Sequence, residues 1–173
     1  MKRHLFNVEI IETSFDGIDN EKFSQWIQDQ YKDNGTYDRP LGYSEGEDTP
    51  LPMCEEIEKL FKYAQETLAS ELNAATVPQG YWAQVHERGM STNTHAHLPA
   101  DVAGVYYVQT PENCGWLAFE MEPIPPEFTE PKVGKMVLFP AWLKHHVTRN
   151  NSDERRISVS FNLGITGTAN TDQ

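Results

Sequence analysis

The first part of the chain has the hydrophobic spacing of helices. Residues 20–33 and residues 52–73 carry apolar side chains at intervals of three and four, so each segment has one apolar and one charged face. The apolar faces consist of Phe23, Trp26, Ile27 and Tyr31, and of Ile57, Leu60, Phe61, Ala64, Leu68 and Leu72. Residues 3–10 mix apolar and polar side chains and predict a short opening strand. The Gly-, Asp- and Pro-rich residues 34–50 predict an exposed loop.

From residue 81 the pattern changes to that of short strands. The predicted strands are residues 81–88, 102–110, 115–120, 135–139, 143–148 and 157–163. Residues that favour turns and loops separate them, including the Pro-rich segment 121–133. This order of elements predicts a mainly β fold with N-terminal helices, in which two helices buttress an antiparallel sandwich or barrel.

The length of 173 residues fits one domain with its own hydrophobic core. We expect a single domain over residues 1–173. Its parts are an N-terminal strand with supporting helices (1–78), a β-barrel core (79–165) and a flexible tail (166–173).

Charge and composition narrow the possible partners and location. The formal net charge of −12 repels phosphate backbones and anionic lipid, so the sequence predicts neither a nucleic-acid partner nor a membrane-surface partner. No apolar stretch approaches the roughly 20 residues of a membrane span, and the first residues do not continue as an export signal. Cys54 and Cys114 lie far apart in the sequence, which argues against a disulfide framework. We therefore expect a cytoplasmic protein.

Four of the six histidines fall within two short segments. His95 and His97 are two residues apart, and in an extended segment such side chains project to the same side. About fifty residues later, either His145 or His146 can point inward, but not both, because neighbours on a strand face opposite ways. Three neutral imidazoles would hold a metal ion and leave coordination positions open. A lone histidine is more often a surface or core residue, but this concentration favours a metal site.

An arginine pair opens the last predicted strand. Arg156 shares a face with Ser158 and Ser160, whereas Arg155 lies on the face of Ile157, Val159 and Phe161. One of the two guanidinium groups therefore points into the barrel. A guanidinium is planar and can donate two parallel hydrogen bonds to a carboxylate. The alternation alone leaves open which face is the inner one.

Together these motifs resemble the Fe(II)/2-oxoglutarate oxygenase superfamily. The motifs are His95-x-His97, Gly104-Val105-Tyr106-Tyr107-Val108, Leu138-Phe139-Pro140-Ala141-Trp142-Leu143-x-His145-x-Val147 and Arg156-Ile157-Ser158-Val159-Ser160-Phe161-Asn162. Each motif is weak alone, but jointly they are specific, and the resemblance covers residues 81–164. More narrowly, the chain looks like a small bacterial and phage group of 2-oxoglutarate oxygenases related to prolyl hydroxylases.

The resemblance implies a double-stranded β-helix, that is, a jelly-roll, cupin-like barrel. It implies that His95 and His145 are ligands of Fe(II), and that His97 takes the position usually held by Asp or Glu. Arg156 would clamp the distal carboxylate of 2-oxoglutarate. The departure at His97 leaves the metal open, because three neutral imidazoles also suit zinc, copper or a cupin-type iron. Asp101 is a fallback third ligand if its loop bends back.

By the same resemblance, Tyr107 and either Gln84 or His86 would line the pocket of the co-substrate. Packing of these side chains inside the barrel is the alternative interpretation. We expect the large aromatic residues to form core or pocket wall rather than a dedicated recognition surface; they are Trp82, Trp116, Phe119 and Trp142.

The predicted function is that of a 2-oxoglutarate-dependent dioxygenase. It would couple decarboxylation of 2-oxoglutarate by O₂ to hydroxylation of a small-molecule or peptide substrate, with ascorbate as a reductant and peptidyl proline as a candidate substrate. A second hypothesis is a cupin-like three-His metalloenzyme that needs no keto-acid co-substrate. A non-catalytic binding module with a closed zinc site is a third. We expect residues 34–50 and 121–133 to border the mouth of the barrel, because barrels display function on their connections.

Overall fold

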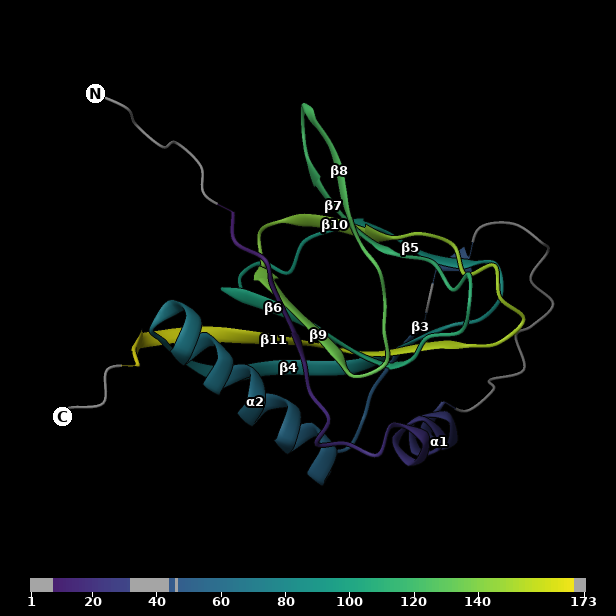
Figure 1. Ribbon diagram of the computed structural model, residues 1–173, viewed down its shortest axis with the longest axis horizontal. Coiled ribbons are helices and arrows are strands. Elements are labelled where there is room, and N and C mark those ends of the chain that lie inside the picture. The colour runs from purple at the N-terminus through teal and green to yellow at the C-terminus, as the bar shows by residue number, and fades with distance from the viewer. Residues whose placement is uncertain (1–7, 32–43, 46, 170–173) are drawn as a thin grey trace.

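The described part of the protein consists of two facing β-sheets and two helices, which cover the outer face of the larger sheet (Figure 1). The computed structural model describes residues 8–31, 44–45 and 47–169. The larger sheet has the order β1-β9-β6-β11-β4-β3 and the smaller one the order β2-β5-β10-β7-β8. All pairings are antiparallel except that of β2 with β5. The jelly-roll, double-stranded β-helix predicted from the sequence is confirmed.

The larger sheet contains six strands and the smaller sheet five. The strands of the larger sheet are β1 (Ile11–Ser14), β3 (Glu47–Thr49), β4 (Ala74–His86), β6 (Val102–Gln109), β9 (Lys135–Pro140) and β11 (Arg156–Thr168). Those of the smaller sheet are β2 (Ser44–Glu45), β5 (Met90–His95), β7 (Leu117–Met121), β8 (Ile124–Thr129) and β10 (Lys144–Val147). None of the described helices is long and apolar enough to cross a membrane.

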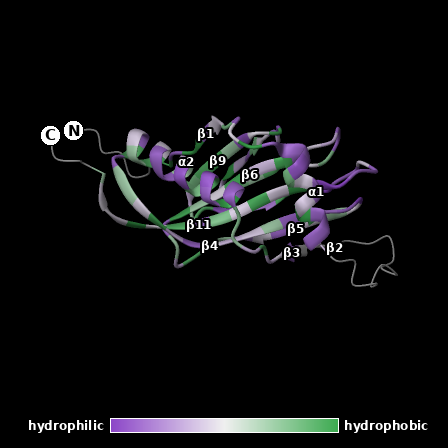
Figure 2. Ribbon diagram, turned by 90° about the horizontal axis from the view of Figure 1, so that it is seen from below, coloured by the Kyte–Doolittle hydropathy of each residue, from purple (hydrophilic) through white to green (hydrophobic). Residues whose placement is uncertain are grey.

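Both predicted helices form, and a capping residue marks the start of α1 and the end of α2. Helix α1 (Asn20–Gln30) starts after Asp19, whose carboxylate accepts the backbone N–H of Lys22. Helix α2 (Glu55–Leu72) ends at Asn73, which takes the left-handed conformation common at helix ends. Their outer faces are largely hydrophilic, in front of more hydrophobic strands (Figure 2).

Two layers of core lie on opposite sides of the larger sheet. The apolar faces of α1 and α2 pack against Tyr106 of β6 and Phe161 of β11 in the outer layer. The inner layer fills the barrel between the sheets and includes Val105, Phe139 and Val147. Strand β6 contributes to both layers by alternation, which explains why residues 102–108 are all buried.

Several predicted boundaries are wrong. The opening strand expected at residues 3–10 lies partly outside the described residues, and the strand that forms is β1. Residues 34–43 and 46 of the predicted loop are also outside the described part, but 44–45 and 47–49 form β2 and β3. Strand β5 was not predicted as a strand, and β11 continues to Thr168 into the predicted flexible tail.

Proline residues explain two further corrections. Strand β4 runs through Pro78, although the predicted strand began only at residue 81. At Pro78 the strand pairs with β11 on one side, whereas β3 on the other side pairs only with residues 83–85. The other edge of β4 at Pro78 therefore needs no N–H donor. Likewise β8 forms within the Pro-rich segment predicted as a loop. It is an edge strand that pairs only with β7, where proline is tolerated.

Candidate metal centre

Three histidines from two neighbouring segments converge inside the barrel. His95 ends β5, His97 follows it by two residues, and His145 lies on β10 directly opposite His95. One nitrogen of each ring lies within 4.8 Å of the other two, and the Nε2 atoms of His97 and His145 are 3.1 Å apart. Two ligands at about 2.1 Å from one ion are separated by roughly 3.0–3.4 Å, so this spacing suits a common first-row metal.

Backbone carbonyls set the orientation of two of the rings. The Nδ1 atom of His95 is 2.7 Å from the carbonyl oxygen of Asn93, and Nδ1 of His145 is 2.9 Å from that of Leu143. A carbonyl oxygen only accepts, so both Nδ1 atoms must carry the proton. In the neutral rings the lone pair then lies on Nε2, which is the tautomer that metal-binding histidines adopt when a second group fixes Nδ1.

Burial keeps two of these histidines neutral. It lowers the pKa of His97 to about 4 and that of His145 to about 3, and the positive charge that neighbouring histidines can carry acts in the same direction. Neither ring needs to lose a proton at neutral pH before it binds a metal.

An unpaired cation lies in the same cavity as the three histidines. Arg156 is 1% exposed, and none of the ion pairs among the described residues involves it. Its guanidinium lies over the Tyr107 ring at 5.3 Å, and its Nη1 is 3.4 Å from Nδ1 of His86. A buried charge without a counter-ion is costly, so this position favours binding of an anion.

Further buried polar atoms in this region also lack partners among the described residues. They are Nε of Arg156, the hydroxyl groups of Tyr107 and Ser158, and Nε1 of Trp82. Burial raises the pKa of Tyr107, so its phenol remains a proton donor at neutral pH. Every one of these groups can donate a hydrogen bond, which fits a carboxylate that enters the barrel. The residues present therefore suit both a metal ion and a dicarboxylate.

The structure settles which face of β11 points inward. Ile157, Val159 and Phe161 belong to the outer core, whereas Ser158 and Ser160 line the cavity with Arg156. Arg155 lies on the outer side, where it pairs with Glu87. The alternation of β11 could have located both serines once the inner face was known.

The other predicted site residues take different places. Gln84 lines the cavity, but His86 and Tyr107 are not among the lining residues and contact Arg156 from two sides. His146 points away from the histidine cluster, as expected, and bonds Glu120. Asp101 does not belong to the group of three histidines, and its carboxylate accepts the backbone N–H of Ile165.

The aromatic residues divide into two groups. Trp82 lines the cavity and Phe119 is buried in the inner core, in agreement with the expected roles. Trp116 and Trp142 are 46% and 48% exposed, so their assignment to core or pocket wall was wrong. Trp116 lies just before β7, and Trp142 lies in the turn between β9 and β10.

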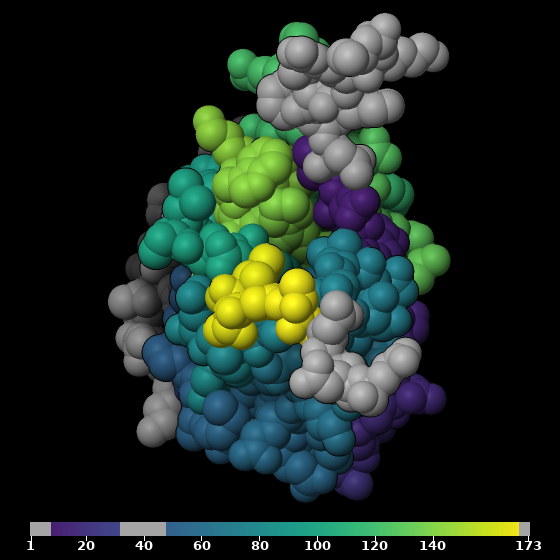
Figure 3. Space-filling model, turned by 90° about the vertical axis from the view of Figure 1, so that its left-hand side faces the viewer, coloured from purple at the N-terminus to yellow at the C-terminus, as the bar shows by residue number. Residues whose placement is uncertain are grey.

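A larger cavity, of about 290 Å³, lies outside the barrel and contains no histidine. It is mainly apolar and is lined by Leu72 of α2, Pro140 of β9 and Ile165 of β11, among others. Figure 3 faces the end of the molecule where these elements meet. The three histidines line instead the smaller cavity, of about 30 Å³, between the sheets.

Comparisons with known proteins agree with this geometry. The family model described as "Putative 2OG-Fe(II) oxygenase" matches residues 122–162, which include His145 and Arg156. No curated protein matches the sequence. This family match confirms the resemblance that the sequence motifs indicated, and solved structures of 2-oxoglutarate oxygenases share the fold.

Three such structures cover most of the chain. A 2OG-Fe(II) oxygenase family oxidoreductase from Burkholderia pseudomallei has 12% identity and a TM-score of 0.63, over 90% of this chain and 84% of its own. A viral collagen prolyl hydroxylase from Paramecium bursaria Chlorella virus-1, solved with 2OG, has 14% identity and a TM-score of 0.64, over 89% and 94%. A prolyl-4-hydroxylase from Pseudomonas putida has 13% identity and a TM-score of 0.59, over 88% and 91%.

Proposed function

We propose that this protein is an Fe(II)- and 2-oxoglutarate-dependent dioxygenase that hydroxylates a C–H bond of a peptide or small molecule. The observation that carries the proposal is the buried, unpaired Arg156 in the same cavity as the cluster of His95, His97 and His145. Iron, when bound, supplies the O₂-dependent chemistry that couples decarboxylation of 2-oxoglutarate to hydroxylation. The protein supplies ligands, charge and an enclosed site.

Charge balance supports 2-oxoglutarate as the co-substrate. Three neutral imidazoles leave the +2 charge of an iron ion uncompensated, and Arg156 adds a buried positive charge. A dicarboxylate offers one negative end to each of these two cationic positions. Tyr107 and Ser158 would donate further hydrogen bonds near Arg156, and Gln84 would contact the co-substrate from the cavity wall.

The candidate substrate class follows the comparisons. A prolyl hydroxylase from Trichoplax adhaerens, solved with a peptide of hypoxia inducible factor, has 15% identity and a TM-score of 0.65. We therefore take peptidyl proline as the first substrate to test, and small molecules as the next. Ascorbate would serve as the reductant in such assays.

Succinate formation tests the proposal directly. Purified protein would be incubated with Fe(II), ascorbate, O₂ and 2-oxoglutarate, with and without proline-containing peptides, and succinate would be measured. The expected result is succinate formation that requires His145, with His145→Ala as the inactive control. Failure of the wild-type protein to bind 2-oxoglutarate in the presence of Fe(II), together with no succinate, would contradict the proposal.

A cupin-like metalloenzyme without a keto acid is the second candidate. The observation that favours it is His97, because a third imidazole stands where a carboxylate is usual. The two candidates make opposite predictions for Arg156→Met. An enzyme that needs no keto acid keeps its activity when the carboxylate clamp is lost, whereas a 2-oxoglutarate oxygenase does not.

A further inference from the structure

His86 is completely buried next to the Arg156 guanidinium. It lies on β4 directly opposite Arg156 on β11, so both side chains point into the barrel from neighbouring strands. It does not line the cavity of the metal cluster. Its two ring nitrogens contact the side chains of Arg156 and Thr92, so any role of His86 at this site would be exerted through these neighbours.

The hydrogen bonds of His86 define a single tautomer. Nη1 of Arg156 is 3.4 Å from Nδ1 of His86, and a guanidinium can only donate, so Nδ1 is the acceptor. Nε2 then carries the proton and donates to the Thr92 hydroxyl at 2.8 Å. Burial, assisted by the charge of Arg156, lowers the pKa of His86 to about 3, which keeps the ring neutral and able to accept.

The contacts continue from His86 to the cavity wall. The Thr92 hydroxyl donates to Oε1 of Gln84 at 3.4 Å, and Gln84 lines the cavity together with Arg156. Thr92 belongs to β5 in the smaller sheet, whereas His86 and Gln84 belong to β4 in the larger one. This series of contacts connects the two sheets next to the guanidinium. It also links Arg156 to Gln84, the two cavity-lining residues at its ends.

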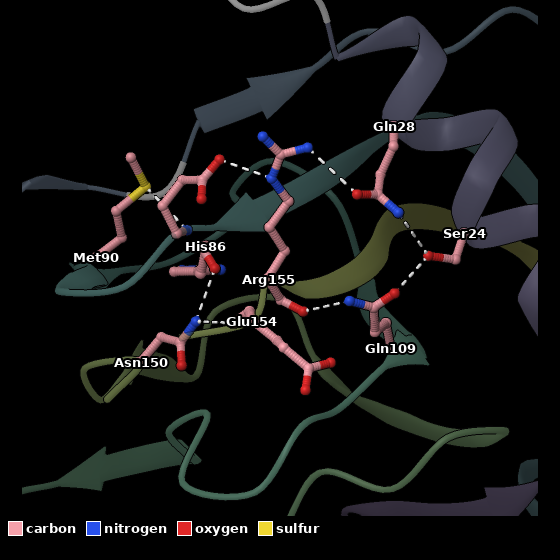
Figure 4. Close-up of polar contacts among 9 residues, drawn as sticks. Ser24, Gln28, His86, Met90, Gln109, Asn150, Glu154 and Arg155 are labelled. Atoms are coloured by element: carbon pink, nitrogen blue, oxygen red, sulfur yellow. Dashed lines mark hydrogen bonds and ion pairs between the residues drawn. The ribbon is translucent and has the colours of Figure 1, made fainter. Parts of the chain in front are cut away.

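Hydrogen bonds also hold the backbone of His86 and the residues that flank this pair (Figure 4). Nδ2 of Asn150 donates to the carbonyl oxygen of His86 at 2.8 Å and to that of Glu154 at 2.9 Å. The side chain of Arg155 donates to Glu87 at 2.7 Å and to Gln28 of α1 at 3.2 Å. Glu87 next to His86 and Arg155 next to Arg156 are therefore paired with each other outside the barrel.

We propose that His86 is a positioning residue, which holds the Arg156 guanidinium in the orientation that receives the distal carboxylate of 2-oxoglutarate and couples it through Thr92 to Gln84. This inference rests on the proposed function. A hydrogen bond to a charged group contributes to orientation as well as to stability, and its loss lets the long arginine side chain adopt other rotamers.

Two keto acids distinguish a positioning role from a purely structural one. 2-Oxoglutarate carries the distal carboxylate, whereas pyruvate has the keto acid group without it. Binding of each to the anaerobic protein loaded with Fe(II) would be measured for the wild type, His86→Phe and His86→Asn. The phenyl ring fills the space but cannot accept a hydrogen bond, while Oδ1 of asparagine can accept one near the position of Nδ1.

We expect His86→Phe to weaken 2-oxoglutarate binding about tenfold and to leave pyruvate and Fe(II) binding within about twofold of the wild type. His86→Asn should retain most of the preference for 2-oxoglutarate. Thr92→Val, which removes only the hydroxyl, should weaken 2-oxoglutarate binding about threefold. This variant tests the proposal if His86→Phe does not fold.

Unchanged 2-oxoglutarate affinity in folded His86→Phe, or in Thr92→Val where the former does not fold, would overturn the inference. An equal loss of 2-oxoglutarate and pyruvate binding would also overturn it, because it would indicate general damage to the barrel. Absence of 2-oxoglutarate binding by the wild type would instead refute the proposed function and, with it, this inference.

Discussion

Replacement of Arg156 by methionine should raise the stability of the protein and, in the same variant, weaken co-substrate binding about 100-fold. The side chain is 1% exposed, has no acidic partner among the described residues, and leaves its Nε without a hydrogen bond. Methionine fills a similar space without charge. The variant therefore removes an unfavourable buried cation from the ligand-free protein and, with it, the group that we propose binds the distal carboxylate.

The expected gain in stability follows from opposing contributions. An uncompensated buried ion costs several kcal/mol, and replacing buried charge by apolar groups often stabilises by about 1–4 kcal/mol. The contact with the Tyr107 ring at 5.3 Å offsets about 1–2 kcal/mol, and the long bond to His86 at 3.4 Å offsets somewhat less. We expect a net rise of about 1 kcal/mol in the free energy of unfolding.

The expected loss of affinity is much larger. Truncation of one partner in a buried, hydrogen-bonded charge pair costs about 2–5 kcal/mol, so the dissociation constant of 2-oxoglutarate should rise about 100-fold. Pyruvate binding should change little, because pyruvate lacks the distal carboxylate.

Arg155→Met is the matched control. Arg155 lies on the outer face, where its guanidinium pairs with Glu87 and bonds Gln28, so its loss should lower stability slightly and leave 2-oxoglutarate affinity within about threefold. Urea unfolding would be measured on metal-free protein, and keto-acid binding on anaerobic protein loaded with Fe(II). A fall of more than about 1 kcal/mol in the unfolding free energy of Arg156→Met would refute the reasoning that this cation is uncompensated.

Three further predictions concern the metal, pH and packing. Fe(II) at about 100 times its Kd should raise the free energy of unfolding of the wild type by about 2.7 kcal/mol and therefore raise its Tm. His145→Ala should show no such rise, and removal of the metal by EDTA should reverse it in the wild type. Unfolding raises the pKa of His86 from about 3 to its ordinary value of 6.5, so the wild type should lose stability as pH falls below 6.5. Between pH 7 and pH 4.5 the free energy of unfolding, measured with urea, should fall by about 2.5 kcal/mol more in the wild type than in His86→Asn. Equal losses in the two proteins would contradict the prediction. Gly104→Ala would place a Cβ 2.3 Å from the Phe161 ring and should lower the unfolding free energy by about 1–3 kcal/mol, whereas Gly80→Ala, with open space around it, should change little.

The local chemistry of the site could be predicted from the sequence, but several elements around it could not. The spacing of His95 and His97 predicted that both imidazoles share a side, and the structure brings them together with His145. By contrast, β8 was missed because its prolines indicate a loop, and only its place at a sheet edge makes them tolerable. The length of β4 was also missed, because pairing with β11 along almost its whole length overrides the local effect of Pro78.

The periodicity of the sequence by itself determined which side chains lie on the same face of each strand or helix. It separated Arg156, Ser158 and Ser160 from Arg155 and its apolar neighbours, and it gave the two helices their apolar faces. The inner face of β11 was decided only by tertiary structure, because the helices pack on one side of the sheet and the smaller sheet closes over the other. The same long-range packing placed His86 behind the guanidinium, since a cross-strand partner depends on register between segments seventy residues apart.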